Sequence, residues 1–412
     1  MRLVLSLLLC MSALLADGIP REEYKNRRTQ LRKSLDGVMV LFGAEEPEDL
    51  HVSFFEESNF LYLSGWREPG AVMMLTPKEE ILFLPPRNQH TETFTGHKTS
   101  ADDPGVIQKT GFDKVLPYAA IESTFLKLIE TSSRLYTLAD DRQAQKLKSF
   151  AVLHESSDAG KAIAALRMIK SPAEIELITK TTEISVQAHL AAWKALKSGM
   201  YEYQVAAVMT NAYFERGCER SAYAPIVGSG PNSIVLHYMS NHRRIDSGEV
   251  VLMDVGAECS DYATDITRTV PANGKFTDRQ REIYNIVLGA QKAAIAAIKP
   301  GVRVRGEAPS LQQIARDYIN THGKDLHGDS LGKYFTHGLS HHVGLDVHDP
   351  SNDPNDTLRP GMIITIEPGV YIPEENIGVR IEDTLLVTEN GSKNLSGGLP
   401  REAAEIEKLV GK

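Results

Sequence analysis

The chain has 412 residues, of which 42% are hydrophobic and 24% are charged, and its formal net charge at pH 7 is −9. Its length exceeds that of a typical single hydrophobic core, so two domains are expected in a soluble globular enzyme. The negative charge argues against a nucleic-acid partner, which would require a basic face.

Residues 1–18 have the pattern of a secretory signal peptide. One early arginine precedes an apolar run over residues 3–15, and small residues follow. The run is too short for a lasting membrane anchor, so we expect an exported protein, periplasmic or secreted, without membrane attachment after signal removal. A buried first helix is the alternative interpretation. The mature chain keeps Cys218 and Cys259, which could pair in an oxidising compartment, but their spacing does not decide it. We expect a core that does not depend on a disulfide.

Residues 19–165 are predicted to form the smaller, N-terminal α/β domain. Short apolar runs at 37–43, 71–77 and 80–86 are bounded by Gly and Pro, as is typical of strands. Residues 119–131 have helical patterning instead. This alternation predicts a sheet covered by helices.

Residues 166–412 are predicted to form the second domain, in which two capping boxes mark helix starts. The boxes are Ser171 with Glu174 and Thr277 with Gln280. Pro172 stands at the first position of the first helix, which we expect to run to Gly199. The second helix is expected to end before Pro300.

Four carboxylates occupy unusual places in two predicted strand pairs, 249–258 with 262–270 and 362–371 with 378–387. They are Asp254, Asp265, Glu367 and Glu382. A buried carboxylate without a partner is costly, so an acidic residue in an apolar strand requires a cation or hydrogen-bond donors. A hairpin through residues 258–262 would bring both aspartates onto one face, and Arg380 and Glu382, two positions apart, share one face of their strand. Taken singly, each aspartate could instead cap a turn, and Glu382 could form a surface salt bridge.

Together, the four carboxylates indicate a dinuclear metal site. Two divalent cations neutralise four carboxylates, whereas one cation leaves a surplus. Oxygen ligands with one imidazole suit Mn²⁺, which we expect, or Zn²⁺ or Co²⁺, with the ions roughly 3.5 Å apart. A water bridging them would be partly hydroxide at neutral pH. Residues 336–349 hold four histidines, His337, His341, His342 and His348, of which we expect one to bind metal and others to surround the substrate.

The order of these residues resembles that of the pita-bread metallopeptidases, most closely Xaa-Pro aminopeptidase and Xaa-Pro dipeptidase. The segments that carry the resemblance are HGLSHHVGLDVHD, TIEPGVY and RIEDT, together with two aspartates eleven positions apart. The resemblance implies an α+β fold with a C-terminal pita-bread (creatinase/aminopeptidase-like) catalytic domain. It implies that the metal ligands are Asp254, Asp265, His341, Glu367 and Glu382. It also implies that His237, in VGSGPNSIVLHY, lies on the substrate side with His337 and His348, and that Arg380 steadies the site; His342 is given no role.

The segment SNFLYLSGWREPGAVMML, which begins at Ser58, is similar to the N-terminal domain of the same family at Asn59, Phe60 and Tyr62, among others. The resemblance therefore spans about residues 20–405. In relatives this domain narrows the cleft and contributes to subunit contacts. We accordingly expect short peptides as substrates and a homo-oligomer, either a dimer or a tetramer.

The resemblance implies an aminopeptidase that releases the N-terminal residue from peptides with proline in the second position. A metal-bridging hydroxide would attack the carbonyl carbon, and Glu367 would carry the proton to the leaving nitrogen. His237 and His348 would stabilise the developing charge. Because proline lacks an N–H and its ring fixes the backbone, a pocket shaped for it excludes ordinary peptides.

Several alternatives remain beside this interpretation. A Xaa-Pro dipeptidase, which cuts only dipeptides, is the nearest, and the sequence does not separate the two. Methionine aminopeptidase shares the ligands but generally lacks the N-terminal domain, and a metal-free creatinase-like enzyme would not keep all five. A catalytically inactive binding scaffold would have lost ligands, whereas this chain retains every one.

Overall fold

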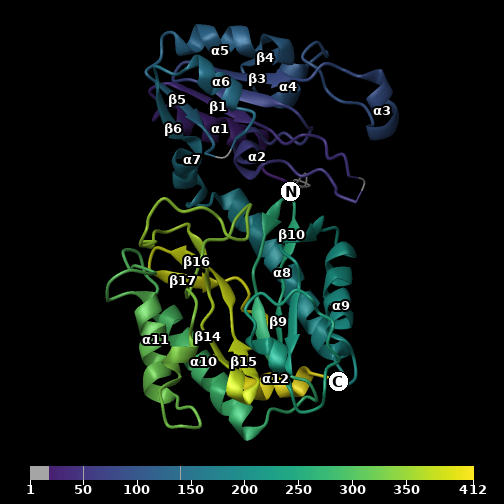
Figure 1. The fold of residues 1–412 in the computed structure, drawn as a ribbon, viewed down its shortest axis with the longest axis vertical. Helices are drawn as coiled ribbons and strands as arrows, with labels where there is room; N and C mark the ends of the chain where they lie inside the picture. The colour runs from purple at the N-terminus through teal and green to yellow at the C-terminus, as the bar shows by residue number, and fades with distance from the viewer. Residues whose placement is uncertain (1–17, 50, 140) are drawn as a thin grey trace, which may run out of the picture.

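The computed structural model describes residues 18–49, 51–139 and 141–412. The predicted signal peptide, except for its last residue, lies outside the described residues. Figure 1 shows two lobes, an N-terminal lobe in purple and blue and a C-terminal lobe in teal to yellow, with helix α8 (Pro172–Ala195) running from their junction into the second. Among the described helices, none combines the length and apolar character needed to cross a lipid bilayer.

The N-terminal lobe is a mixed sheet with the strand order β4-β3-β2-β1-β5-β6. Its strands are β1 (Val38–Phe42), β2 (Val72–Leu75), β3 (Glu80–Leu84), β4 (Lys114–Pro117), β5 (Arg134–Thr137) and β6 (Glu155–Asp158). Its helices are α1 (Arg21–Arg32), α2 (Ser58–Ser64), α3 (Gln89–Thr95), α4 (Val106–Thr110), α5 (Ile121–Ile129), α6 (Gln145–Phe150) and α7 (Ala159–Arg167). The predicted strands and helix are confirmed. The central strands are apolar throughout because α5 and α6 cover one face of the sheet, and α1, α2 and α7 cover the other.

The C-terminal lobe contains the larger hydrophobic core. Its remaining helices are α9 (Glu202–Phe214), α10 (Asp278–Ala296), α11 (Leu311–His322) and α12 (Ala403–Leu409). Its strands are β7 (Arg220–Ser221), β8 (Ile226–Ser229), β9 (Val250–Asp254), β10 (Ala257–Cys259), β11 (Tyr262–Ala263), β12 (Thr267–Pro271), β13 (Ile363–Ile366), β14 (Gly369–Ile372), β15 (Ile377–Arg380), β16 (Asp383–Thr388) and β17 (Gly391–Asn394). Short 3-10 helices span Tyr118–Ala120, Gly230–Ile234, Leu331–Tyr334 and Pro373–Glu375.

Both predicted capping boxes are present. The Ser171 hydroxyl accepts from the Glu174 backbone N–H, while the Glu174 carboxylate accepts from the Ser171 N–H, and the box at Thr277 has the same pattern. Helix α10 ends before Pro300 as expected. The prediction that α8 runs to Gly199 is wrong, because Leu196 takes an extended conformation and its side chain is buried in the core.

Each predicted strand pair is divided into two shorter pairs. Strand β9 pairs with β12 and β10 with β11, while β13 pairs with β16 and β14 with β15. The first pair breaks at Gly256, where an added Cβ would lie 1.8 Å from the Thr264 carbonyl oxygen, so no side chain fits. The second breaks at Pro368, which has no N–H to donate to a ladder.

The breaks place the four carboxylates at strand ends. Asp254, predicted within a longer strand, is the last residue of β9, and Glu367 follows the end of β13. The prediction that Asp265 and Glu382 lie within strands is wrong, since Asp265 lies between β11 and β12, and Glu382 between β15 and β16. Residues just outside a strand are free to turn their side chains toward a common point.

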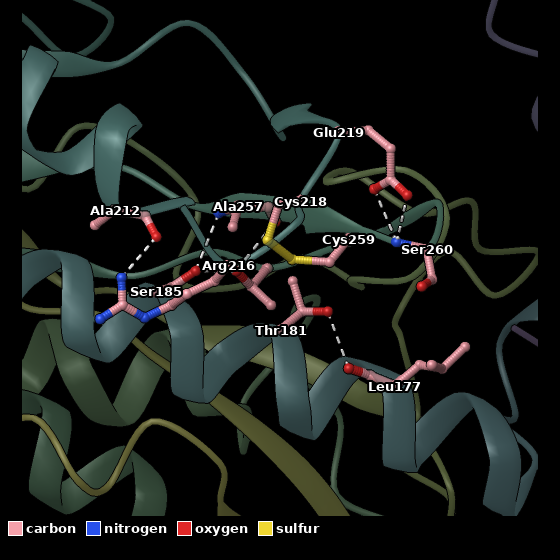
Figure 2. Close-up of a disulfide and its surroundings, with 11 residues drawn as sticks. Leu177, Thr181, Ser185, Ala212, Arg216, Cys218, Glu219, Ala257, Cys259 and Ser260 are labelled. Atoms are coloured by element: carbon pink, nitrogen blue, oxygen red, sulfur yellow. Dashed lines mark hydrogen bonds between the residues drawn. A yellow bond between two sulfur atoms is a disulfide. The ribbon is translucent and has the colours of Figure 1, made fainter. Parts of the chain in front are cut away.

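Cys218 and Cys259 form a disulfide, with a Cα–Cα distance of 4.2 Å. Figure 2 shows the bridge above helix α8, whose Thr181 and Ser185 lie beneath it. It links the segment after α9 to β10, where β10 pairs with β7. The sequence left this pairing open, and the structure supplies it.

Candidate metal centre

The five predicted ligands converge on one place. Their ligand atoms, with those of His348, form three overlapping groups, and within each group the atoms lie within 4.8 Å of one another. The groups are Asp254, Asp265 and Glu382; His341, Glu367 and Glu382; and Asp265, His341 and His348. His341 Nε2 lies 3.4 Å from Asp265 Oδ2 and 3.4 Å from Glu367 Oε1.

Strand β12 joins the segments that carry the carboxylates. It pairs along β9, with Thr267 opposite Asp254. On its other side, the Glu382 N–H donates to the Thr267 carbonyl at 3.0 Å, and the Thr269 hydroxyl donates to the Arg380 carbonyl at 3.1 Å. The end of β9 and the residues after β15 are thereby held side by side.

Arg380 and Glu382 do face the same way, although Glu382 is outside the strand. The Arg380 guanidinium forms an ion pair with Asp254 and donates from Nε to the Thr267 hydroxyl at 3.1 Å. That hydroxyl donates to Glu382 Oε2 at 2.6 Å. The alternative of a surface salt bridge is excluded, because Glu382 is only 1% exposed.

Two tyrosines belong to the site, and the sequence interpretation missed both. The Tyr223 hydroxyl lies within hydrogen-bond distance of Asp254 Oδ1 and Asp265 Oδ1, so it links the two aspartates. The Tyr371 hydroxyl accepts from Arg380 Nη1 at 2.8 Å and lies 2.9 Å from His337 Nε2. Tyr371 closes the quoted motif TIEPGVY and could have been noticed there, whereas nothing in the sequence marks Tyr223.

The predicted substrate-side histidines surround the carboxylates. His337 Nδ1 lies 3.8 Å from Glu367 Oε2, and the ring centroids of His348 and His341 are 4.3 Å apart. Burial lowers the pKa of His337 and of His348, and the exposed His237 contributes to both shifts, so the three imidazoles share one region.

His342, for which no role was predicted, points elsewhere. Its buried ring lies 3.3 Å from Asp356. Its carbonyl oxygen is 3.0 Å from His341 Nδ1, which places the proton of a neutral His341 on Nδ1 and leaves Nε2 free to bind a metal.

The electrostatics show an excess of buried negative charge. Burial raises the pKa of Asp265, with the Asp254 charge adding to the effect, and burial raises the pKa of Glu367 to about 7. Burial and three neighbouring carboxylates raise the pKa of Glu382 well above its usual value. Burial alone would raise the pKa of Asp254 too, but the Arg380 charge lowers it. Burial would lower the pKa of His341, but Asp265 and Glu367 raise it to about 9.

These residues fit divalent cations. Four carboxylates face a single guanidinium, that of Arg380, and Glu382 Oε1 is buried without a hydrogen-bond partner among the described residues. An orphaned buried carboxylate oxygen is costly, and a cation between the carboxylates would satisfy it. The donor set, oxygen ligands with one imidazole, accommodates Mn²⁺, Zn²⁺ or Co²⁺.

The fold and this site define a two-domain metallopeptidase, and comparison with known proteins agrees. Residues 176–389 match the model of metallopeptidase family M24, and residues 24–136 match the aminopeptidase P N-terminal domain. The chain belongs to metallopeptidase family M24. The predicted α+β architecture, a pita-bread domain after a smaller N-terminal domain, is confirmed.

Relatives match along nearly the whole chain. The Xaa-Pro aminopeptidase of Haemophilus influenzae is 34% identical, over 95% of this chain and 98% of that protein. The structure of Escherichia coli aminopeptidase P in a low-pH form covers the same shares at 30% identity, with a TM-score of 0.86. The Xaa-Pro dipeptidase of Pyrococcus furiosus is 35% identical, over 82% of this chain and 90% of that protein.

Proposed function

We propose that this metallopeptidase is an Xaa-Pro aminopeptidase, which releases the N-terminal residue from short peptides with proline in the second position. The observation that carries the proposal is the convergence of five metal ligands with three further histidines around them. Similarity to Xaa-Pro aminopeptidases over both lobes supports it.

Divalent ions held by Asp254, Asp265, His341, Glu367 and Glu382 would supply Lewis acidity and lower the pKa of a bound water. Glu367 lies between His341 and His337 and is the carboxylate placed to take a proton and pass it to the leaving nitrogen. Burial, reinforced by the Arg380 charge, lowers the pKa of His337 to about 4, so its imidazole is neutral at pH 7. Its ring nitrogens are held by the Gly338 carbonyl and the Tyr371 hydroxyl, which fix the ring beside Glu367.

Finer features of the proposal rest on chemistry rather than on similarity. Mn²⁺ is the proposed metal because carboxylate oxygens make up four of the five ligands. Export is proposed from the N-terminal signal pattern, and the Cys218–Cys259 disulfide supports it because such bonds persist in oxidising compartments. The proposed assembly is a dimer or a tetramer.

Hydrolysis of Arg-Pro-Pro and Gly-Pro by the purified protein, with and without chelator and added Mn²⁺, tests the proposal. Release of arginine from the tripeptide, abolished by chelator and restored by Mn²⁺, is expected. Cleavage of Gly-Pro but not of Arg-Pro-Pro would instead establish an Xaa-Pro dipeptidase, the alternative that similarity to the Pyrococcus furiosus enzyme supports. A metal content near zero with no hydrolysis of either peptide would indicate the inactive scaffold.

A further inference from the structure

A buried ionic cluster ties the N-terminal lobe to the loop that carries His348. We call Arg167, Lys170, Asp346 and Asp349 the interlobe cluster. Arg167 Nη2 donates to Asp346 Oδ2 at 2.7 Å and to Asp349 Oδ1 at 2.6 Å, and Lys170 Nζ donates to Asp349 Oδ2 at 2.9 Å. The side chains of Arg167, Lys170 and Asp349 are each 1% exposed, so the two ion pairs of Asp349 are shielded from water, whereas Asp346 is 44% exposed.

Two residues of helix α2 complete the connection. The Ser58 hydroxyl donates to Asp346 Oδ1 at 2.6 Å, and Arg167 Nη1 donates to Asn59 Oδ1 at 2.9 Å. Asn59 belongs to the N-terminal motif, whose function the metal centre does not explain. The N-terminal lobe therefore reaches both Asp346 and the guanidinium that holds Asp349.

In the sequence His348 lies between these two aspartates, on a loop that is closed by two hydrogen bonds of its own. The Asp349 N–H donates to the His342 carbonyl at 3.0 Å, and the Asp346 N–H donates to Asp349 Oδ1 at 3.3 Å. The loop begins at the metal-ligand segment and returns to it, so anchoring both aspartates sets the path of the backbone at His348.

The His348 imidazole depends on this backbone for its position. Its side chain is exposed, and no hydrogen bond from the described residues holds its ring. An imidazole that must face a reacting carbonyl without hydrogen-bond partners is aimed by the segment that carries it and by its contact with the His341 ring. Small misplacements of such groups cost rate steeply.

We propose that Ser58, Asn59, Arg167 and Lys170 are positioning residues for His348, through which the N-terminal lobe sets the reactivity of the catalytic lobe. The proposal rests on the proposed function, because it assigns these residues to the Xaa-Pro hydrolysis in which His348 takes part. None of the four touches the metal-ligand atoms, so their effect travels through the loop.

The test combines a mild interlobe variant with removal of the histidine. The four proteins are the wild type, S58A/N59A, H348A and the triple variant S58A/N59A/H348A, loaded with Mn²⁺ and assayed on Arg-Pro-Pro. S58A/N59A removes three side-chain hydrogen bonds, two to the interlobe cluster and one from Asn59 to Glu57, without removing a charge. We expect kcat to fall about tenfold while KM changes less than about twofold. The triple variant should match H348A within about twofold, because a histidine that is absent cannot be misplaced.

The control is R67M, which cuts another contact between the lobes, the ion pair of Arg67 with Asp261. It should keep kcat within about twofold of the wild type, since partly exposed pairs contribute little. The proposal is overturned if S58A/N59A leaves kcat unchanged, if the triple variant loses a further tenfold relative to H348A, or if R67M lowers kcat as much as S58A/N59A. A wild type inactive on every Xaa-Pro peptide would overturn the proposed function instead, and circular dichroism with metal analysis checks that each variant is folded and loaded.

Discussion

The metal centre and the interlobe cluster are both largely buried groups of charges, joined by residues 341–349, yet they are built in opposite ways. The interlobe cluster matches two carboxylates with two cations. The metal centre sets four carboxylates against one guanidinium and one imidazole. The difference shows how buried carboxylates can be sorted: those matched by side-chain cations hold the structure together, and those in surplus are a binding site for cations from solution.

The pKa shifts follow the same division. Burial would raise the pKa of Asp349, but the charges of Lys170 and Arg167 lower it. In the metal centre, burial raises the pKa of Glu367 to about 7 and that of Glu382 well above its usual value. The charges of the interlobe cluster are balanced without a ligand, whereas the carboxylates of the metal centre hold protons until a metal replaces them.

The largest effect is expected from breaking the metal centre. Asp265→Ala and Glu382→Ala should each lower hydrolysis of Arg-Pro-Pro by well over 100-fold, more than the loss typical for an outer-shell partner, while circular dichroism shows a folded protein. Asp246→Ala, which removes an exposed carboxylate, should leave turnover near that of the wild type. Normal turnover by Asp265→Ala would contradict the dinuclear interpretation.

Breaking the interlobe cluster should act on stability as well as on rate. Arg167→Met leaves two aspartates without their shared cation, so the free energy of unfolding should fall by about 3–5 kcal/mol in denaturant titrations. Lys180→Met, which removes an exposed ion pair with Glu176 on helix α8, is the matched control and should cost less than about 1 kcal/mol. Equal losses in the two variants would show that burial of the cluster adds nothing.

The disulfide lies in the C-terminal lobe, which contains the metal centre. The chain between Cys218 and Cys259 contains Tyr223, His237 and Asp254, so the bridge restrains a segment that carries site residues. Replacing both cysteines with serine should lower the free energy of unfolding by about 2–4 kcal/mol, measured against the oxidised wild type. Treatment of the wild type with reductant should reproduce the change, and an unchanged unfolding midpoint in both experiments would argue that the bridge is dispensable.

The smallest effect is the response to pH, which should appear as metal affinity in the metal centre and as stability in the interlobe cluster. Glu367 with a pKa of about 7 and His341 with a pKa of about 9 hold protons at neutral pH in the metal-free protein, so metal binding must release them. The apparent Mn²⁺ affinity should rise by up to about tenfold per pH unit for each proton released, as calorimetry in buffers of different ionisation enthalpy would show. Affinity independent of pH between about 6 and 8 would contradict this.

Asp349 should respond in a lower pH range, and through the stability of the fold rather than through metal affinity. Its pKa in the folded protein lies below the ordinary value of about 3.9, so its contribution to stability is present above that pH and is lost as pH falls through the lower folded value. Acid unfolding of the wild type and Arg167→Met should therefore converge at low pH.

Much of the site could be predicted from the sequence because the ligand residues occur in recognisable motifs at set spacings. Asp254, Asp265, His341, Glu367 and Glu382 were all found in this way, and the structure brings their ligand atoms together. The predicted strands around them were too long. The pattern of apolar residues does not show where a neighbouring backbone leaves no room for a side chain, as the Thr264 carbonyl does at Gly256. Tyr223 was missed because a single tyrosine carries no pattern.

The sequence by itself determined the local structure and indicated the candidate ligands. Ser171 and Thr277 cap their helices through hydrogen bonds to residues three positions away. Only the tertiary structure decided which residues contact the candidate ligands and the loop that carries His348. Arg167 meets Asp349 across 182 positions, and Tyr223 reaches Asp265 across 42. Contacts within one turn of helix are set by backbone geometry that the neighbouring residues specify, whereas contacts over such separations exist only once the lobes have packed and excluded water from the charges.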